Sequence, residues 1–194
     1  MNGSEEETAG EASCVRFQVG GASPPSVPAR GAEGSERCLR LRLLGAMDIE
    51  PLWQLVKEEP KAFLDRRLSR EEFFAALGRV NDLYFLLEEQ GGIGGGYRFS
   101  DITPGWQAEA HSFFFDRKLD ERAAFIRAFL LWIMDELHLR IIRGIASLKH
   151  QRSLKWCFEQ IGFVQDGILR QAVPGTFDDV VLLSLTREDI RRAA

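Results

Sequence analysis

A chain of 194 residues with 45% hydrophobic residues is long enough to bury the core of one domain and too short for two comfortable domains. Its formal net charge of −4 belongs to the N-terminus, because residues 1–36 hold six acidic and two basic side chains while 37–194 hold 23 of each. A formally neutral domain has no net field with which to hold a polyphosphate, so general nucleic-acid binding is disfavoured.

The first 36 residues are rich in Gly, Ser, Pro and Glu and contain one aromatic residue, Phe17. Such a segment buries too little apolar surface to offset the entropy lost on ordering. We therefore expect 1–36 to be a disordered acidic tail in front of a single domain spanning 37–194. The domain opens with RCLRLRLL, 37–44, whose alternation of polar and apolar residues predicts a half-buried strand.

Two short helices are predicted next. Asp48 is placed to cap a helix that ends near Lys57. Ser69 and Glu72 form the pattern S-x-x-E, in which each side chain bonds the other residue's backbone N–H, and this capping box predicts a second helix through about Leu77.

Three strands and a long helix follow. Strands at about 82–89, 93–101 and 106–115 are separated by the turn sequences QGG and ITPG, which predicts an antiparallel meander. The helix spans about 120–138, and its apolar residues recur every four positions as a stripe that faces the core. The members of that stripe are Phe125, Ile126, Phe129, Leu130, Ile133 and Met134.

The C-terminal part begins with a strand at 139–146 and a helix at about 149–160, and strands at 163–171 and 178–186 complete it. The long helix between two strands demands a parallel crossover, whereas the meander before it is antiparallel. The sequence therefore predicts a mixed, mostly antiparallel α/β sheet flanked by helices.

Three widely separated cysteines, Cys14, Cys38 and Cys157, match neither a disulfide framework nor a zinc site. They suit a reducing compartment, so we expect a cytoplasmic protein without a bound metal. The longest apolar run, 129–134, is too short to cross a bilayer, and the acidic N-terminus does not match a secretory signal. We expect no membrane association.

The helix at 149–160 ends in the pattern S-x-x-x-x-x-E-x-x-G-F, formed by Ser153, Glu159, Gly162 and Phe163. Together with the order of the elements, this pattern resembles the GNAT family of N-acetyltransferases. The continuation VQDGILRQAV resembles the branch that acetylates the N-termini of ribosomal proteins. The resemblance implies a GNAT-like acyl-CoA N-acyltransferase fold and acetyl-CoA as the acyl donor.

In that family, acetyl-CoA lies where two strands splay apart, here 106–115 and 139–146, and backbone N–H groups of an R/Q-x-x-G-x-G/A loop hold its pyrophosphate. This chain has RKLDER, 117–122, in which Asp120 and Arg122 replace the small residues. As an N-cap, Asp120 would take the donors that a phosphate needs. Alternatively, basic side chains hold the phosphates. The resemblance places these residues beside the cofactor: Phe115, Arg117, Lys118, Arg122, His150 and Ser153.

Glu109 and His111 alternate onto one face of the strand WQAEAHSFFF and are candidates for general base. A carboxylate beside an imidazole is able to take a proton from an ammonium group, directly or through water. The alternative is an ion pair on a solvated strand face. Phe158 occupies the position at which many family members have a tyrosine that protonates the departing thiolate.

Two functions follow from this pattern. The first is acetyl transfer from acetyl-CoA to a primary amine, either a small molecule or a peptide N-terminus, by a monomer or homodimer. The second is a protein that keeps the fold without catalysis and serves as a binding protein or as a phage structural or accessory component. The RKLDER loop favours the second function, and the C-terminal motif favours the first.

Overall fold

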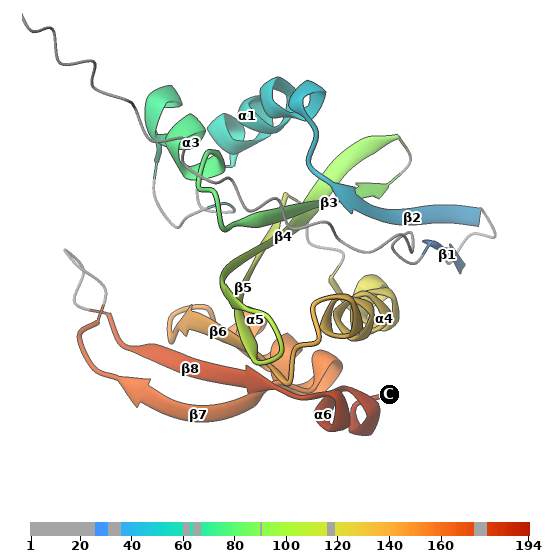
Figure 1. The fold of residues 1–194 in the computed structure, drawn as a ribbon, viewed down its shortest axis with the longest axis vertical. Helices are drawn as coiled ribbons and strands as arrows, with labels where there is room; N and C mark the ends of the chain where they lie inside the picture. The colour runs from blue at the N-terminus through green and yellow to red at the C-terminus, as the bar shows by residue number, and fades with distance from the viewer. Residues whose placement is uncertain are drawn as a thin grey trace, which may run out of the picture.

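The computed structural model describes residues 26–30, 36–59, 63, 67–89, 91–115, 119–172 and 178–194. They form one mixed sheet with the strand order β1-β2-β3-β4-β5-β6-β8-β7 (Figure 1). The strands are β1 (Ser26–Arg30), β2 (Glu36–Leu43), β3 (Leu83–Glu89), β4 (Gly92–Thr103), β5 (Gln107–Phe114), β6 (Ile141–Ser147), β7 (Val164–Leu169) and β8 (Val180–Leu185). The helices are α1 (Ile49–Glu58), α3 (Arg70–Leu77), α4 (Leu119–Glu136), α5 (Gln151–Trp156) and α6 (Arg187–Arg192).

The predicted mixed α/β class is confirmed: β5 and β6 pair in parallel through the α4 crossover, and the other neighbours pair antiparallel. The N-terminal boundary differs from the prediction. Strand β1 lies inside the expected disordered tail and pairs with β2 from Ser26↔Arg40 to Arg30↔Glu36. Backbone pairing to an edge strand needs little side-chain burial, so composition alone did not reveal it. Residues 1–25 and 31–35 lie outside the described residues.

The two short helices have different beginnings. Ser69 Oγ accepts from the Glu72 N–H at 3.1 Å and Glu72 Oε2 accepts from the Ser69 N–H at 2.8 Å, which confirms the capping box of α3. Asp48 makes no side-chain cap to α1. Its carboxylate instead binds the Arg42 guanidinium, with Oδ1 2.7 Å from Nη2, and accepts from the Gly45 N–H. Because two donors hold it, the pKa of Asp48 lies below its usual value.

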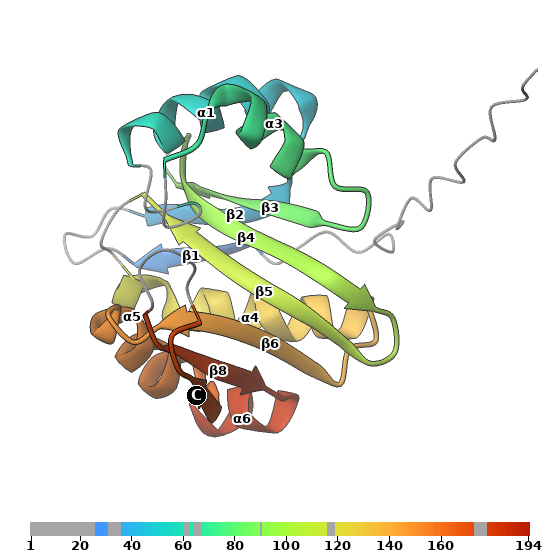
Figure 2. The same cartoon turned by 90° about the vertical axis from the view of Figure 1, so that its left-hand side faces the viewer.

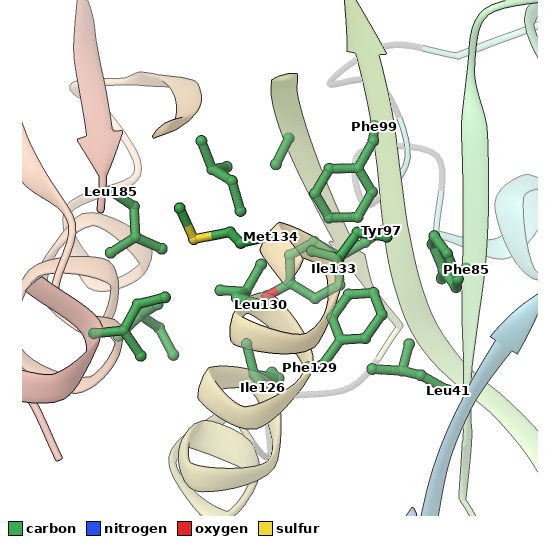
Figure 3. Packing of buried hydrophobic residues seen from close by; sticks show 14 of the residues in the cluster. Leu41, Phe85, Tyr97, Phe99, Ile126, Phe129, Leu130, Ile133, Met134 and Leu185 are labelled. Carbon is green, nitrogen blue, oxygen red and sulfur yellow. The ribbon is translucent and has the colours of Figure 1, made fainter. Parts of the chain in front are cut away.

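The main core lies between the sheet and α4 (Figure 3). The predicted stripe of α4 is buried, with Phe129, Leu130, Ile133 and Met134 all at 0% exposure. Phe129 contacts Phe85 of β3 with ring centroids 5.1 Å apart and Tyr97 of β4 at 5.6 Å. This cluster also takes residues from β2, β5, β6, β8 and α6, so α4 is the element that joins both halves of the sheet.

A second core covers the opposite face of the sheet's N-terminal half, where α1 and α3 lie side by side (Figures 1 and 2). Trp53 of α1 and Phe73 of α3 pack with centroids 5.2 Å apart. Phe63 links them to Tyr84 of β3 and Phe113 of β5. These aromatic residues are therefore buried packing groups and do not wall a groove.

The C-terminal helix is interrupted. After α5, residues Cys157–Ile161 form a π-helical turn, in which one extra residue widens the helix. The turn ends at Gly162, whose φ is +99°. A Cβ there would lie 2.6 Å from the Asp189 backbone oxygen, so both the dihedral and the approach of α6 require glycine. Leu154 packs onto Val181 and Leu183 of β8 and covers one face of this half of the sheet.

The other face of β6, β8 and β7 has no helix over it in the described part of the chain. Register places Ile145, Leu182 and Val164 on the side away from α5, and Ile145 and Val164 are 43% and 48% exposed. No helix in the described ranges is long and apolar enough to cross a membrane.

Candidate functional site

The parallel junction between β5 and β6 is short. The two strands pair at Gln107↔Ile141, Ala108↔Ile142 and Glu109↔Arg143, although β5 continues to Phe114 and β6 to Ser147. Beyond Glu109 the strands pair with their outer neighbours, β4 and β8. We call the space between β5 and β6 beyond Glu109 and Arg143 the gap. The backbone groups of both strands that face it make no β5–β6 ladder hydrogen bonds among the described residues. An extended ligand with amide groups is the natural partner for such a gap.

Glu109 and His111 stand where the junction ends, and the structure brings them into contact as predicted. The imidazole Nε2 of His111 lies 2.7 Å from Oε1 of Glu109, and the two side chains are 34% and 27% exposed. The hydrogen bond from His111 is the main reason why the pKa of Glu109 lies below its usual value, with a smaller contribution from the Arg98 charge. The carboxylate is thus ionised and directed at the ring, and among the described residues no partner is found for the second ring nitrogen.

An arginine lies beside each member of this dyad. Arg98 is the register partner of His111 on β4, and its Nε donates to Asp82 Oδ2 at 2.7 Å in a largely buried pair. Arg143 is the register partner of Glu109 on β6 and is exposed. Directly paired strand residues point to the same face, so the dyad and both arginines share the face away from α4.

Arg122 has a different role from the one expected in the phosphate loop. Its side chain is 1% exposed, and Nη2 donates to Glu89 Oε2 of β3. The guanidinium carbon lies 6.0 Å from the centroid of the Phe114 ring, and Nη2 would lie 3.1 Å from a Cβ at Gly94. Arg122 therefore points into the protein and neutralises Glu89, and we remove it from the proposed phosphate ligands.

The rest of the loop is partly outside the described residues. Arg117 and Lys118 fall there, and the structure gives no account of them. Helix α4 begins at Leu119, so Asp120 lies inside its first turn and does not precede it as the expected N-cap. The Phe115 N–H donates to the Gly94 carbonyl at 3.1 Å, and the Phe115 ring packs against Phe113 at 6.0 Å. Phe115 thus closes the α1 and α3 cluster.

The gap is bordered by α5 on the α4 side of the sheet. His150 and Ser153 are exposed at the start of α5, and their role toward a ligand stays a prediction. Trp156 is 6% exposed and packs its ring against Phe114, with centroids 6.3 Å apart. Its indole N–H is buried and has no partner in the described part of the chain. Helix α5 therefore contacts β5 at Phe114, beyond the residues of β5 that pair with β6.

A hollow of about 260 Å³ lies on the other side of α5. Phe158, at the family's tyrosine position, lines it together with Leu154 and Val181, and polar side chains surround it. Neither Glu109 nor His111 belongs to this hollow, so it is separate from the dyad.

Sequence reasoning missed Arg98, Arg143 and Trp156. Arg143 interrupts the apolar strand sequence IIRGIA, and a lone charge in such a strand was a usable signal. Two glycines of β4 lie against neighbouring backbone: a Cβ at Gly96 would lie 2.2 Å from the Phe85 carbonyl oxygen and one at Gly95 would lie 2.4 Å from that of Phe113. These glycines leave room for neighbouring backbone.

No protein-family model matches the chain, and no curated protein sequence matches it. Solved structures do. The spermidine N-acetyltransferase from Vibrio cholerae in complex with CoA and spermine is 18% identical with a TM-score of 0.65, and the match covers 79% of this chain and 98% of that one. A putative acetyltransferase from T. thermophilus is 20% identical with a TM-score of 0.63 over 80% and 89%. A further putative acetyltransferase is 19% identical with a TM-score of 0.66 over 89% and 91%. The chain therefore has the fold of the GNAT acetyltransferases.

Proposed function

We propose that this protein transfers an acetyl group from acetyl-CoA to a primary amine. One observation carries the proposal: the Glu109–His111 hydrogen bond stands at the point where β5 and β6 separate. A base and its orienting carboxylate therefore sit beside a gap suited to an extended acyl donor. The fold shared with N-acetyltransferases supports the same reaction, and the ribosomal-protein branch remains a part of the proposal that rests on the C-terminal motif alone.

His111 is the proton acceptor in this mechanism. Its Nε2–H donates to the ionised Glu109, which leaves Nδ1 as the basic nitrogen of the neutral ring. Nδ1 takes the proton from the amine as the amine nitrogen attacks the thioester carbonyl carbon. Glu109 stabilises the imidazolium that results, so its lowered pKa matches its task. The C–S bond then breaks, and the sulfur leaves as the thiolate.

The donor would lie along the open sides of β5 and β6. In this proposal, backbone N–H groups of β5 past Glu109 would meet the carbonyl oxygen as it gains charge. His150 and Ser153 border the gap from α5 and would contact the donor there. Among the basic residues expected at the pyrophosphate, Arg117 and Lys118 remain proposed ligands, and Arg122 does not because Glu89 holds it.

The non-catalytic alternative has one specific observation in its favour. Arg122 occupies a position at which the family uses a small residue, and its buried ion pair with Glu89 fills space at the base of the loop. Removing one member of a buried ion pair costs about 3–5 kcal/mol, so this arrangement is not readily displaced by a ligand. In this alternative, the chain retains the sheet and the gap but binds no acyl donor.

Calorimetric titration of the full chain with acetyl-CoA separates the two functions. Micromolar binding, followed by release of free CoA thiol when amines are added, is the expected result. Absence of binding up to millimolar acetyl-CoA would overturn the proposal and leave the alternative.

The Asp120→Gly variant sharpens this titration. An anion near a helix N-terminus is worth about 0.3–1 kcal/mol, so removing the resident carboxylate should strengthen acetyl-CoA binding by roughly two- to fivefold. Asp120→Asn is the matched control, because it removes the charge and keeps the size of the side chain. Equal affinity in all three proteins would show that Asp120 does not compete with the diphosphate.

A further inference from the structure

We propose that Arg143 selects the acceptor, and that the acceptor is a primary amine that also carries a carboxylate, in the manner of an amino acid or of a peptide with an acidic first residue. This inference rests on the proposed acetyl transfer and adds the chemical class of its second substrate. It follows from the position of Arg143, from its charge, and from the hydrogen bonds that the neighbouring acidic groups already make.

Arg143 is the register neighbour of the dyad across the parallel junction. It is paired with Glu109 at the last rung of the parallel junction, and neighbouring strands in a sheet lie about 4.8 Å apart. Its own neighbours Ile142 and Gly144 are buried, whereas Arg143 is exposed on the face that carries Glu109 and His111. Its register partner on β8 is Ser184, which is 8% exposed. An acceptor that reaches His111 from this face therefore passes beside Arg143.

The surrounding charges leave Arg143 as the group available to a ligand. In the part of the chain that the structure describes, no hydrogen-bond or ion-pair partner is found for Arg143. Glu109 is held by His111, and Asp82 is held by Arg98. The Asp166 carboxylate accepts from Ser184 Oγ at 2.8 Å. Among the described residues, Glu109, Asp82 and Asp166 each bond a residue other than Arg143.

This charge pattern matches an amine with a nearby carboxylate. The ammonium end is attracted by Glu109, loses one proton to water and gives a second to His111 as it attacks, while the carboxylate end takes paired N–H donors from the guanidinium. A polyamine lacks the carboxylate and would bring a second ammonium group toward Arg143, where like charges repel. The structure of the Vibrio cholerae enzyme holds spermine, a polycation. We therefore infer the opposite preference for this chain.

The test compares alanine, alaninamide and spermidine as acceptors for the full chain with acetyl-CoA. Alanine and alaninamide differ in the carboxylate and in the basicity of the amine, so the contribution of the carboxylate is taken from the change in their ratio of kcat/KM between the wild-type protein and Arg143→Gln. A hydrogen bond to a charged group contributes enough for Arg143→Gln to lower the ratio of alanine to alaninamide by about tenfold or more. Arg143→Glu should favour spermidine. Arg140→Gln is the control, because Arg140 stacks on Trp106 before β6 and should leave the ratio unchanged.

Two further measurements keep the outcomes distinct. A peptide amide that begins with glutamate, compared with one that begins with glutamine, shows whether the carboxylate comes from a peptide or from a free amino acid. Titration of the His111 ring resonances with alanine reports binding without catalysis. Alanine binding that Arg143→Gln abolishes supports the inference even if no acetyl transfer occurs, in which case the proposed function fails alone. An active Arg143→Gln protein with the wild-type preference for alanine overturns the inference and leaves the proposed function intact.

Discussion

The two halves of the sheet are built to different plans. Strands β2 to β5 are covered on both faces, by α4 on one side and by α1 and α3 on the other. Strands β6 and β8 are covered on one face, the edge strand β7 is largely exposed, and the open face carries Ile145, Val164 and Arg143. Aromatic rings fill the doubly covered half, so it serves stability. The singly covered half leaves its second face accessible next to β5, the strand that carries Glu109 and His111.

The largest expected effect is in the Glu109–His111 dyad, at the border between the two halves. General acid–base catalysis contributes about 10²–10⁴-fold, so His111→Ala and Glu109→Gln should each reduce kcat/KM for amine acetylation within that range. Thermal unfolding should change little, because both side chains are partly exposed. The double variant should lose no more than the stronger single variant, since the residues act as a unit. Additive losses would show that Glu109 and His111 work separately.

Large effects on stability are expected in the doubly covered half. Phe129→Ala removes a ring that is 0% exposed and contacts Phe85, Tyr97 and Trp132. We expect a loss of about 3–5 kcal/mol in the free energy of unfolding. Ile145→Ala on the open face should change it by about 0.5 kcal/mol or less. Chemical denaturation measures both. Similar losses for the two variants would mean that the open face is covered by something in solution, and the comparison of the halves would fail.

A smaller loss of stability is expected at the contact between the halves. Arg187 of α6 donates to the carbonyls of Met134 and Leu139 at 2.7 and 2.6 Å, and its charge complements the C-terminal end of α4. Arg187→Met keeps the length and removes both donors, which should cost about 1–3 kcal/mol. Arg192→Met is the control, since Arg192 forms an exposed ion pair with Glu188. The melting temperature of Arg187→Met should fall below that of the wild-type protein, and that of Arg192→Met should stay close to it.

The smallest expected effect is a change in a single titration. Because the His111 hydrogen bond lowers the pKa of Glu109, His111→Ala should raise that pKa toward the usual value. A depressed folded pKa contributes stability above the unfolded pKa, and this contribution is lost as pH falls through the folded value. As the pH falls through the folded pKa of Glu109, the free energy of unfolding should therefore decrease in the wild-type protein more than in His111→Ala. Carboxyl NMR measures the pKa of Glu109 in both proteins. An unchanged pKa in His111→Ala would mean that Arg98, and not His111, lowers it.

The doubly covered half was the easier half to predict. The α4 stripe, the meander and the Ser69–Glu72 box are local patterns, so periodicity and capping chemistry reveal them. The contact between Glu109 and His111 was also local, because residues two apart on a strand share a face.

The features that sequence reasoning missed depend on partners far along the chain. Strand β1 is defined by pairing with β2, the direction of Arg122 by Glu89, and the neighbour of Glu109 by the register of β6. The extra residue of the π-helical turn leaves the apolar spacing nearly unchanged, so periodicity did not separate it from an ordinary helix.

The three-rung junction between β5 and β6 has a mechanical consequence. Ladder hydrogen bonds fix the two halves to each other over a very short length, and side-chain packing on α4 supplies the rest of their alignment. Any molecule that binds both strands beyond Glu109 and Arg143 would hold the two halves of the sheet in a fixed relative orientation. Binding of such a molecule would then restrict the motion of the two halves relative to each other. The buried amide protons of β5 and β6 would exchange more slowly with solvent when it is bound.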